Sequence, residues 1–290
     1  MRRPTILVTG SNGQLGFELA SLLAHSADVV AADRARLDLA DADAIVAAVR
    51  GARPDLIVNA GAYTAVDLAE KEEPLAAAVN ARAPGILAEE AKRLGAVLIH
   101  YSTDYVFDGT RTTPYPEDAP TSPLNVYGAT KLEGERAIAA VGGNALVFRT
   151  SWVYGLRGRN FLLTMRKLAA ERDELRIVSD QLGVPNWCRS LAEATSRVVA
   201  SGVAALADRA GLYHLSATGE ASWYDFARAI VGDVATPRIV PIATADYPLP
   251  ARRPAYGVLD TARFEATFGF ALADWRDTLA RCLASPPERV

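Results

Sequence analysis

Three glycines that directly follow a short apolar strand constrain the fold of this chain more than any other feature. The strand Thr5–Thr9 leads into Gly10-Ser11-Asn12-Gly13-Gln14-Leu15-Gly16, and a helix is predicted over Gln14–Ala24. Gly10 allows a sharp turn, Gly13 allows the backbone to approach a pyrophosphate, and Gly16 allows the helix to pack on the strand. The amino end of such a helix attracts anions. A dinucleotide-binding unit is therefore predicted here.

Short apolar strands alternate with helical patterns over the first 150 residues. The strands are predicted at Thr5–Thr9, Asp28–Ala32, Leu56–Asn59, Ala96–Tyr101 and Ala145–Arg149. They are continuous apolar runs, as expected for a parallel sheet that is covered on both faces. Helical periodicity extends over Gln14–Ala24, Ala42–Val49, Pro74–Leu94 and Val126–Ala140. These repeated units predict an α/β fold with a doubly wound, Rossmann-like parallel sheet.

The pattern becomes less regular after Trp152, which predicts a smaller lobe interleaved with the sheet domain. Helices are predicted over Phe161–Glu171, Leu191–Val199, Trp223–Val231 (capped by Ser222) and Asp274–Leu283. Short strands are predicted at Arg176–Val178 and Gly211–Ala217, and the proline-rich segment Pro241–Pro254 is expected to be extended. We assign residues 1–150, joined by roughly 174–210, to a dinucleotide-binding domain, and residues 151–173 and 211–290 to a substrate lobe.

Composition excludes several classes of protein. Half of the 290 residues are hydrophobic and 22% are charged, the balance of a globular chain. A net charge of −3 without blocks of like charge predicts neither a nucleic-acid nor a membrane partner. No apolar run reaches the ~18 residues of a membrane span, and the run after Met1 is too short for a signal peptide. Cys188 and Cys282 are interpreted as reduced structural thiols. We expect a cytoplasmic protein.

The end of the second predicted strand carries residues that bear on the choice between NADH and NADPH. Asp33 lies 20 residues after Gly13, where a carboxylate accepts hydrogen bonds from an adenosine ribose. A carboxylate there favours NADH, because it repels a 2′-phosphate. Arg34 and Arg36 lie beside it and attract that phosphate, so both cofactors stay open. The dipeptide Asp38-Leu39 is a further candidate for the adenine pocket.

A candidate proton donor lies on the helix predicted after the fourth strand. Tyr127 and Lys131 are four residues apart, and Thr103 lies 24 residues before Tyr127. A phenol with a pKa near ~10 is a poor acid at neutral pH, and a nearby cation lowers that pKa. Residues i and i+4 share a helix face, so Lys131 can supply the cation. The Thr103 hydroxyl can bind the same carbonyl oxygen. With the glycine loop, this set predicts hydride transfer to a carbonyl.

Several other residues allow a structural interpretation. His100 and His214 lie in apolar strand candidates and are interpreted as core histidines. The aromatic residues Tyr154, Trp187 and Trp223 are interpreted as packing residues. The pair Arg252-Arg253 allows two interpretations, as a partner of a substrate diphosphate or as ordinary loop charges.

Five motifs resemble those of the dTDP-4-dehydrorhamnose reductase family, within the extended short-chain dehydrogenase/reductase superfamily. They are Asn59–Glu70 (NAGAYTAVDLAE), Tyr101–Gly109 (YSTDYVFDG), Tyr127–Lys131 (YGATK), Arg149–Gly155 (RTSWVYG) and Asp180–Pro185 (DQLGVP). The second and fourth motifs are quite specific, and the resemblance extends over nearly the whole chain. It implies reduction of the C4 ketone of dTDP-6-deoxy-L-lyxo-4-hexulose, a sugar nucleotide, by NADH or NADPH.

The resemblance also implies roles for single residues. Tyr127 matches the proton donor, Lys131 its partner and a ligand of the nicotinamide ribose, and Thr103 the third member of the set. Trp152 falls at a sugar-nucleotide contact, where its ring face would pack on C–H groups; the substrate set is Thr103, Asp104 and Trp152. Gly61, Ala62 and Tyr63 match a stretch beside the cofactor in the family. The predicted cofactor-binding residues are Gly10, Asn12, Gly13, Gln14, Leu15, Gly16, Asp33, Asp38, Leu39, Gly61, Ala62, Tyr63, Tyr127 and Lys131.

The chain departs from the family pattern at a few positions. The family usually has Thr at the position of Asn186 and Ser at the position of Gly257. Some members have His at the position of Tyr63. These changes bear on substrate fit. Some members form dimers bridged by Mg²⁺ through glutamates, and Glu18 matches one such position. Because Ser190-Leu191-Ala192 offers no further carboxylate, we predict no metal site, and a monomer or a homodimer.

Two alternatives stay open at this point. An epimerase or dehydratase of the same superfamily would keep NAD bound and return the hydride to its product, and Asp104 could serve the elimination step of a dehydratase. A non-catalytic, nucleotide-binding regulatory subunit is the other alternative. The intact set of Thr103, Tyr127 and Lys131 argues against it.

Overall fold

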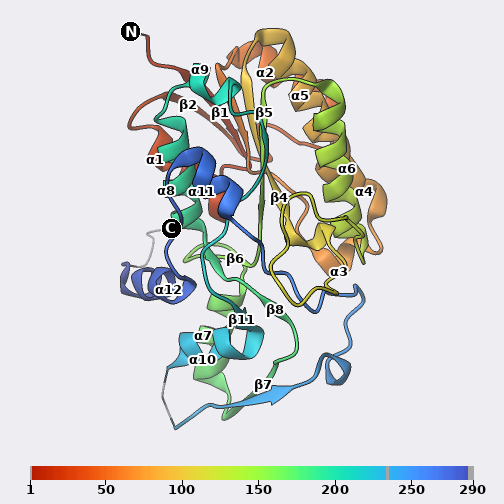
Figure 1. The fold of residues 1–290 in the computed structure, drawn as a ribbon, viewed down its shortest axis with the longest axis vertical. Coiled ribbons are helices and arrows are strands. Elements are labelled where there is room, and N and C mark those ends of the chain that lie inside the picture. Colours follow the sequence, from red (N-terminus) through yellow and green to blue (C-terminus); the bar gives the residue numbers. More distant parts are fainter. Residues whose placement is uncertain (1, 233–234, 287–290) are drawn as a thin grey trace.

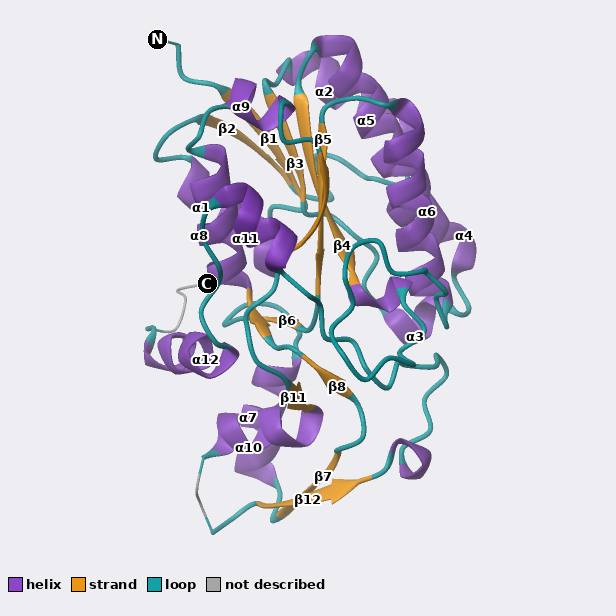
Figure 2. Cartoon of the chain, viewed as in Figure 1, coloured by secondary structure: helices purple, strands orange, loops and turns teal. Residues whose placement is uncertain are grey.

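The computed structural model describes residues 2–232 and 235–286, and its centre is a parallel sheet (Figures 1 and 2). Its strands are β1 (Thr5–Thr9), β2 (Asp28–Ala32), β3 (Leu56–Asn59), β4 (Val97–Thr103), β5 (Ala145–Thr150) and β10 (Gly211–His214). They pair in the order β10-β5-β4-β3-β1-β2, every pair parallel. The predicted doubly wound sheet is confirmed. The chain order reverses beside β1, and open α/β sheets bind ligands at the carboxyl ends of the strands around such a point.

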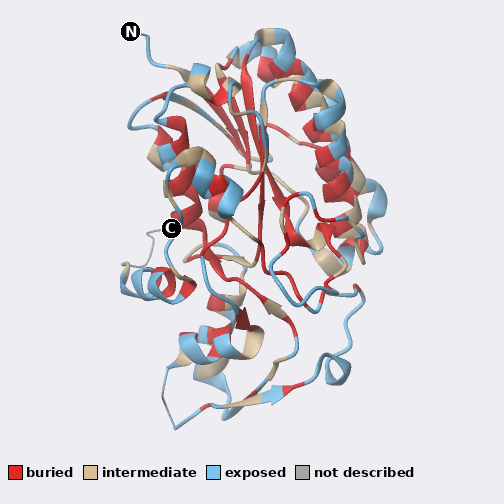
Figure 3. Ribbon diagram, viewed as in Figure 1, coloured by how far each residue is buried: buried red, intermediate tan, exposed pale blue. Residues whose placement is uncertain are grey.

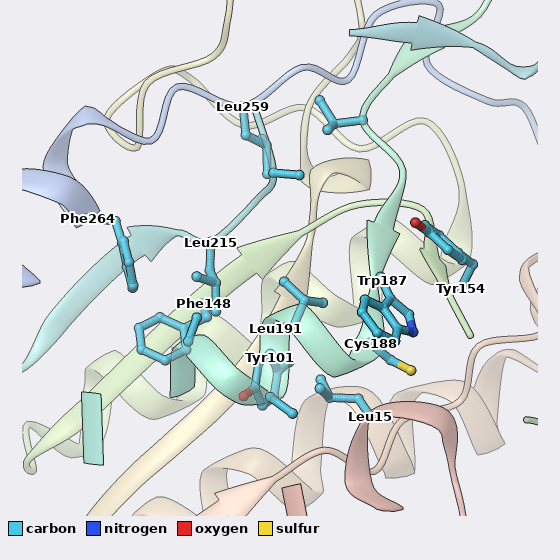
Figure 4. Close-up of a cluster of buried hydrophobic side chains, with 14 of the residues drawn as sticks. Leu15, Tyr101, Phe148, Tyr154, Trp187, Cys188, Leu191, Leu215, Leu259 and Phe264 are labelled. Carbon is cyan, nitrogen blue, oxygen red and sulfur yellow. The ribbon is translucent and has the colours of Figure 1, made fainter. Parts of the chain in front are cut away.

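Helices cover both faces of the sheet, which explains the continuous apolar strands. One face carries α2 (Ala42–Ala52), α5 (Ala83–Leu94) and α6 (Val126–Val141), and the other carries α1 (Gln14–Leu23), α8 (Cys188–Val199) and α11 (Ala262–Phe268) (Figure 1). Leu7 packs in the cluster of the first face, whereas Ile6 and Val8 pack in that of the second. Figure 3 shows the resulting burial of the strands, and Figure 4 shows Leu15, Leu191 and Tyr101 within the second cluster.

A smaller lobe continues from the carboxyl side of the sheet (Figure 1). Its helices are α7 (Phe161–Glu171), α10 (Trp223–Val231) and α12 (Trp275–Ala284). Its paired strands are β7 (Glu174–Val178) with β12 (Arg238–Ile242), β8 (Leu182–Gly183) with β11 (Ala221–Ser222), and β6 (Val153–Tyr154) with β9 (Asn186–Trp187). Ser222 caps α10 as predicted, in a capping box with Asp225.

The prediction of a single helix over Pro74–Leu94 is wrong in one respect, because this segment is not one regular helix. The chain forms α4 (Glu73–Ala77), then a π-helical turn η1 (Ala78–Arg82), then α5. The turn lets the Asn80 side chain bond both backbone groups of Tyr63, accepting from its N–H at 2.8 Å and donating to its carbonyl at 3.0 Å. A π-turn inside a helix has no periodic sequence signal, and such turns often occur at functional sites.

Other differences concern short elements and boundaries. The sequence missed α3 (Val66–Ala69), α9 (Val203–Ala207) and the 3₁₀ turns η2 (Asp104–Val106) and η3 (Thr244–Asp246), as well as α11 and β12. The predicted strand Gly211–Ala217 ends at His214, and η3 interrupts the segment Pro241–Pro254 that was expected to be extended. Elements of three to seven residues hold too few periodic positions to be recognised, and tertiary contacts decide them.

Strand pairing also bears on the predicted domain limits. Residues 174–178 pair with 238–242 in the smaller lobe, whereas residues 211–214 join the central sheet beside β5. Both assignments differ from the predicted ranges, which placed 174–210 with the sheet and 211–290 with the lobe. The division of the chain into two domains stays a prediction.

The contact between α6 and the π-turn predicts a glycine requirement at Gly134. A Cβ on Gly134 would collide with the Asn80 carbonyl oxygen, while Gly51 in α2 has open space around it. We expect Gly134→Ala to lower the free energy of unfolding by about 1–3 kcal/mol, because α6 must move away. Gly51→Ala is the matched control and should raise it by up to about 1 kcal/mol. Urea denaturation measures both, and equal effects of the two substitutions would contradict the close packing.

Candidate active site

The glycine loop after β1 touches the loop after β3. Gly10 adopts a φ of +66°, and a Cβ on it would lie 2.6 Å from the Cα of Gly61. A Cβ on Gly16 would collide with the carbonyl oxygen of Gly10, so α1 can sit this close only with a glycine there. Gly13 precedes α1 and supplies no side-chain cap, so the loop and the amino end of the helix offer backbone groups to a ligand.

A pocket of about 160 Å³ opens between these two loops. Its walls comprise Gly10, Arg34, Leu37, Asp38, Leu39, Gly61, Ala62, Tyr63, Leu75 and Val79. The pocket thus brings together six of the residues predicted to bind a cofactor. It also includes Arg34, whose guanidinium lies 3.8 Å from the Asp38 carboxylate.

Asp33 is directed elsewhere. Its carboxylate accepts hydrogen bonds from the Asn12 amide at 2.8 Å and from the backbone N–H of Arg36 at 3.0 Å. Asp33 therefore ties the glycine loop to the turn after β2. The Arg36 guanidinium donates to the Ala31 carbonyl, at 3.3 Å. Of the two arginines considered for a 2′-phosphate, Arg34 is the one that lines the pocket.

The side chains of Gln14 and Leu15 contribute to packing at the start of α1. Leu15 is buried in the core (Figure 4), and the Gln14 side-chain oxygen accepts a hydrogen bond from Asn160 at 2.8 Å. Asn160 also caps α7, where its side chain accepts from the Leu163 N–H. Gln14 therefore links the glycine loop to the first helix of the smaller lobe.

Thr103, Asp104 and Tyr127 come together where β4 ends and α6 begins. The Thr103 hydroxyl donates to the Asp104 carboxylate at 3.1 Å and interacts with the Tyr127 side chain. Asn125 caps α6 by accepting from the Gly128 N–H at 2.8 Å. A Cβ on Gly128 would collide with the Tyr105 carbonyl oxygen, so glycine at this position lets α6 bring Tyr127 against the strand end.

Burial dominates the electrostatics of Tyr127. Loss of solvent raises the pKa of Tyr127 to about 12, the charge of Asp104 adds to the rise, and the hydrogen bond from Thr103 opposes it. This differs from the predicted lowering by a neighbouring cation. At neutral pH the group is therefore a phenol with a proton to donate.

Lys131 is 2% exposed and directs its amine toward β4. Its Nζ donates to the Tyr101 carbonyl at 2.5 Å and lies 3.2 Å from Nε2 of His100. Burial lowers the pKa of Lys131 to about 8, and the nearby Glu135 carboxylate opposes that shift. The predicted shared helix face is present, but the amine makes its contacts with the strand.

Asp104 combines deep burial with an incomplete set of partners. It is 2% exposed, and its Oδ2 has no hydrogen-bond partner among the described residues. Burial raises the pKa of Asp104 to about 7, against the opposing hydrogen bond from Thr103. A Cβ on Gly257 would collide with this oxygen. Glycine at this position, where the family usually has Ser, therefore leaves space beside the Asp104 carboxyl.

An aromatic-lined cavity of about 410 Å³ lies next to this cluster. Its walls comprise Tyr105, Phe161, Thr164, Met165, Leu168, Arg172, Leu175, Arg176, Ile177, Val178, Gln181, Trp223, Tyr247, Leu249 and Arg253. Tyr105 connects it to the cluster, because its ring meets that of Tyr127 edge to face at 5.7 Å. The cavity therefore continues from the candidate proton donor into the smaller lobe.

Trp152 supports one wall of that cavity. Its backbone has a φ of +41°, in the left-handed region that side chains other than glycine rarely adopt, and its ring stacks on Trp223 at 3.5 Å. A Cβ on Gly183 would lie 2.6 Å from the Trp152 ring. Trp223, which the sequence suggested as a packing residue, is itself part of the wall.

Arg253 and Glu18 are held by ion pairs. The Arg253 guanidinium donates to both carboxylate oxygens of Asp67, at 2.5 and 2.7 Å, so it anchors the loop at the rim of the cavity. Arg252 contributes its carbonyl to Asn125. The Glu18 carboxylate accepts from Arg189 at 2.9 Å. Within the part of the chain that the structure describes, no group of three His, Cys, Asp or Glu residues is arranged to hold a metal.

The comparisons with known proteins agree with this geometry. Residues 4–286 match the family model of the RmlD substrate binding domain. The chain is 49% identical to a dTDP-4-dehydrorhamnose reductase of Burkholderia thailandensis, over 96% of this chain and 97% of the relative. It belongs to the dTDP-4-dehydrorhamnose reductase family. The resemblance inferred from the five motifs is confirmed.

Two further members of the dTDP-4-dehydrorhamnose reductase family extend the comparison. The reductase of Escherichia coli K12 is 42% identical, over 96% of each chain. A crystal structure of the Bacillus anthracis reductase in complex with NADP superposes with a TM-score of 0.91 and 33% identity, over 97% of this chain and 99% of that one. Across the described ranges, none of the helices has the length and apolar character needed to span a membrane.

Sequence reasoning missed that three polar residues beneath Lys131 form one hydrogen-bonded group. Thr9, Asn59 and His100 are buried in or at the ends of β1, β3 and β4 and are linked by hydrogen bonds. A signal was present, because each is a polar residue within an apolar strand, and the carboxyl ends of parallel strands meet at one edge of the sheet.

The pKa of Asp104 predicts how stability depends on pH. Unfolded Asp titrates near ~3.9, so its favourable contribution is complete below that pH and is lost as the pH rises through about 7. Between those values we expect wild type to lose about 1.4 kcal/mol of unfolding free energy per pH unit relative to Asp104→Asn.

Denaturation in urea at a series of pH values measures this difference. Asp108→Asn is the matched control, because hydrogen bonds from the Thr110 N–H and from Tyr115 lower the pKa of Asp108 and keep it ionised in both states above about pH 5. Its effect on stability should not change with pH in that range. Parallel curves for wild type and Asp104→Asn would contradict the raised pKa.

Proposed function

We propose that the chain reduces the C4 ketone of dTDP-6-deoxy-L-lyxo-4-hexulose to give dTDP-L-rhamnose, at the expense of NADPH or NADH. The observation that carries this proposal is the position of the Thr103 and Tyr127 hydroxyls. They lie at the carboxyl end of β4, beside the aromatic cavity. The glycine-lined pocket lies at the same edge of the sheet, at the ends of β1 and β3. Asn80 joins the two regions by bonding both Tyr63 and Thr130.

The residues around the glycine loop fit a nicotinamide dinucleotide. Only glycine can occupy position 10, where a Cβ would meet the Gly61 backbone, and a glycine loop of this kind lets a pyrophosphate approach the backbone. The pocket walls at Leu39 and Ala62 would hold the adenine end, and Arg34 a 2′-phosphate. When bound, the reduced cofactor supplies the hydride. The Bacillus anthracis relative, described in complex with NADP, supports this assignment.

Thr103 and Tyr127 perform the acid chemistry at the C4 oxygen. The Thr103 hydroxyl turns its hydrogen from Asp104 to that oxygen and so orients it. Tyr127 donates its phenolic proton to the same oxygen as negative charge develops there. A pKa of about 12 keeps Tyr127 protonated at neutral pH, and an alkoxide is a stronger base than a phenolate, so transfer toward the sugar is downhill. Lys131 is positioned one turn along α6 to stabilise the phenolate that remains.

The aromatic cavity suits a sugar nucleotide. Trp223, which is stacked on Trp152, offers an apolar face to the C–H groups of a sugar or to a flat base. Arg172 and Arg176 line the same cavity and match the charge of a diphosphate. This combination of an aromatic platform and cations supports a nucleotide-linked substrate over a free sugar.

The role of Tyr127 predicts a large and specific loss of activity. Tyr127→Phe should lower kcat by about 10²–10⁴-fold, because the proton donor is removed, while NADPH affinity changes little. Tyr105→Phe is the matched control and should keep most of the activity. It removes the hydroxyl of a second tyrosine, whose ring centre lies 5.7 Å from that of Tyr127. The assay follows oxidation of NADPH with the dTDP-4-keto sugar. Stoichiometric oxidation also excludes an epimerase or a dehydratase, whereas comparable rates for Tyr127→Phe and wild type would refute the proposed donor.

The position of Arg34 predicts which residue discriminates between cofactors. Arg34→Ala should raise the KM for NADPH by about tenfold and leave that for NADH nearly unchanged, because only NADPH carries the 2′-phosphate. Arg36→Ala should change neither, since that guanidinium binds the Ala31 carbonyl. Steady-state kinetics with both cofactors provide the comparison. A selective loss of NADPH in Arg36→Ala would reverse the assignment of the two arginines.

A further inference from the structure

A continuous chain of buried polar groups lies beneath the catalytic face of α6. Thr9 Oγ1 is 2.6 Å from Asn59 Oδ1, Asn59 Nδ2 is 2.9 Å from His100 Nδ1, and His100 Nε2 is 3.2 Å from Lys131 Nζ. His100 is fully buried, and the other three are at most 2% exposed. At its far end, Thr9 accepts the N–H of Gly61 at 3.3 Å, in the loop that lines the predicted cofactor pocket. The chain therefore connects that loop to Lys131 across β1, β3 and β4.

The direction of each hydrogen bond in this series of buried polar groups follows from the bond between Thr9 and Asn59. A separation of 2.6 Å between Thr9 and Asn59 suits an O–H donor and is short for an amide N–H. Thr9 therefore donates to the Asn59 carbonyl oxygen, which turns the Asn59 NH₂ group toward His100. Nδ1 of His100 must then accept. In a neutral imidazole the proton lies on the other nitrogen, so Nε2–H points at the Lys131 amine.

This arrangement constrains the charge on Lys131. An ammonium group has three donors and no acceptor, so it cannot receive the His100 Nε2–H, whereas a neutral amine can. The other groups around the amine do not remove the conflict. The Tyr101 carbonyl accepts one amine hydrogen, and the Glu135 carboxylate is already bound by Arg149 and by the Ser102 hydroxyl. Tyr127 is a neutral phenol at neutral pH.

We infer that His100, oriented by Asn59 and Thr9, is a positioning residue that disfavours the charged form of the Lys131 amine in the protein without cofactor. Above its midpoint, Lys131 must therefore take up a proton from solvent before it can act as the cation beside Tyr127. The Gly61 loop is the other end of the same chain, so cofactor binding and proton uptake are coupled. The kinetic side of this inference rests on the proposed function, but the proton positions do not.

The proton positions can be measured directly by nuclear magnetic resonance. The protein has three histidines and four lysines, so the histidine and lysine side-chain spectra are both simple. His25→Gln and His214→Gln identify the His100 imidazole by elimination, without changing His100 itself. We expect a neutral ring, with the proton on Nε2 above the midpoint of the Lys131 amine. A proton on Nδ1, or a charged ring, overturns the inference.

The Lys131 amine provides the second readout. Lys71, Lys92 and Lys167 are exposed and serve as internal references. We expect Lys131 to titrate at least about 2 pH units below them, and His100→Gln to raise its midpoint by about 1 unit or more, because the glutamine can offer its carbonyl oxygen to the ammonium. His214→Gln, at the other buried histidine, should leave the midpoint unchanged. A Lys131 midpoint that coincides with the reference lysines, or that His100→Gln does not move, contradicts the inference.

Cofactor binding tests the coupling. Above the midpoint of Lys131 the Kd for NADPH should rise by up to about tenfold per pH unit, and His100→Gln should shift that onset upward together with the amine. Quenching of protein fluorescence measures the Kd without turnover. A Kd that is independent of pH in wild type overturns the coupling. If NADPH fails to bind at any pH, the proposed function is at fault, and the two titrations still decide the proton positions.

Discussion

The close seating of α6 against the carboxyl end of β4 is the constraint on which the site depends. It requires glycine at Gly128 beneath the Tyr105 carbonyl and at Gly134 beneath the Asn80 carbonyl. With both in place, one helix delivers Tyr127 to the strand end and Lys131 to the strand interior. The neighbouring loop follows from the same contact, because the π-turn that receives Gly134 also holds the backbone of Tyr63 through Asn80.

Burial, more than ion pairing, sets the protonation states around this helix. Removing solvent raises the pKa of Tyr127 and Asp104 and lowers that of Lys131, so each shift favours the neutral form. The buried ion pair of Arg149 with Glu135 is bidentate, and its carboxylate also accepts from Ser102, the arrangement that a buried ion pair requires. Burial therefore favours neutral donors and acceptors in the site, beside a compensated charge pair.

The sequence predicted the sheet well because its signal is local. Each strand of the central sheet is a short apolar run. Consecutive residues such as Leu7 and Val8 are buried on opposite faces, so the run of apolar residues is continuous. The glycine loop was equally predictable, since Gly10 needs a positive φ and Gly16 a close approach. The smaller lobe was harder, because β8 and β11 are two residues each and exist only through their pairing.

Side-chain direction was the part of the site that spacing could not predict. Asp33 stands at the expected position, but its carboxylate is taken by Asn12 and a backbone N–H. Lys131 shares a helix face with Tyr127, but its amine finds its contacts on β4. In both cases the identity of the residue indicated the correct region, and partners from distant segments decided where its polar atoms point. Such partners leave no trace in the local pattern.

The buried chain from Thr9 to Lys131 has an energetic consequence for the fold. Four polar side chains inside a sheet core would cost several kcal/mol if any were left unpaired, and apolar residues of similar size would avoid that cost. The chain is tolerated because each member satisfies the next, and removing one member exposes the desolvation cost of its neighbours. A network of this kind fixes one arrangement of protons as firmly as packing fixes one arrangement of side chains.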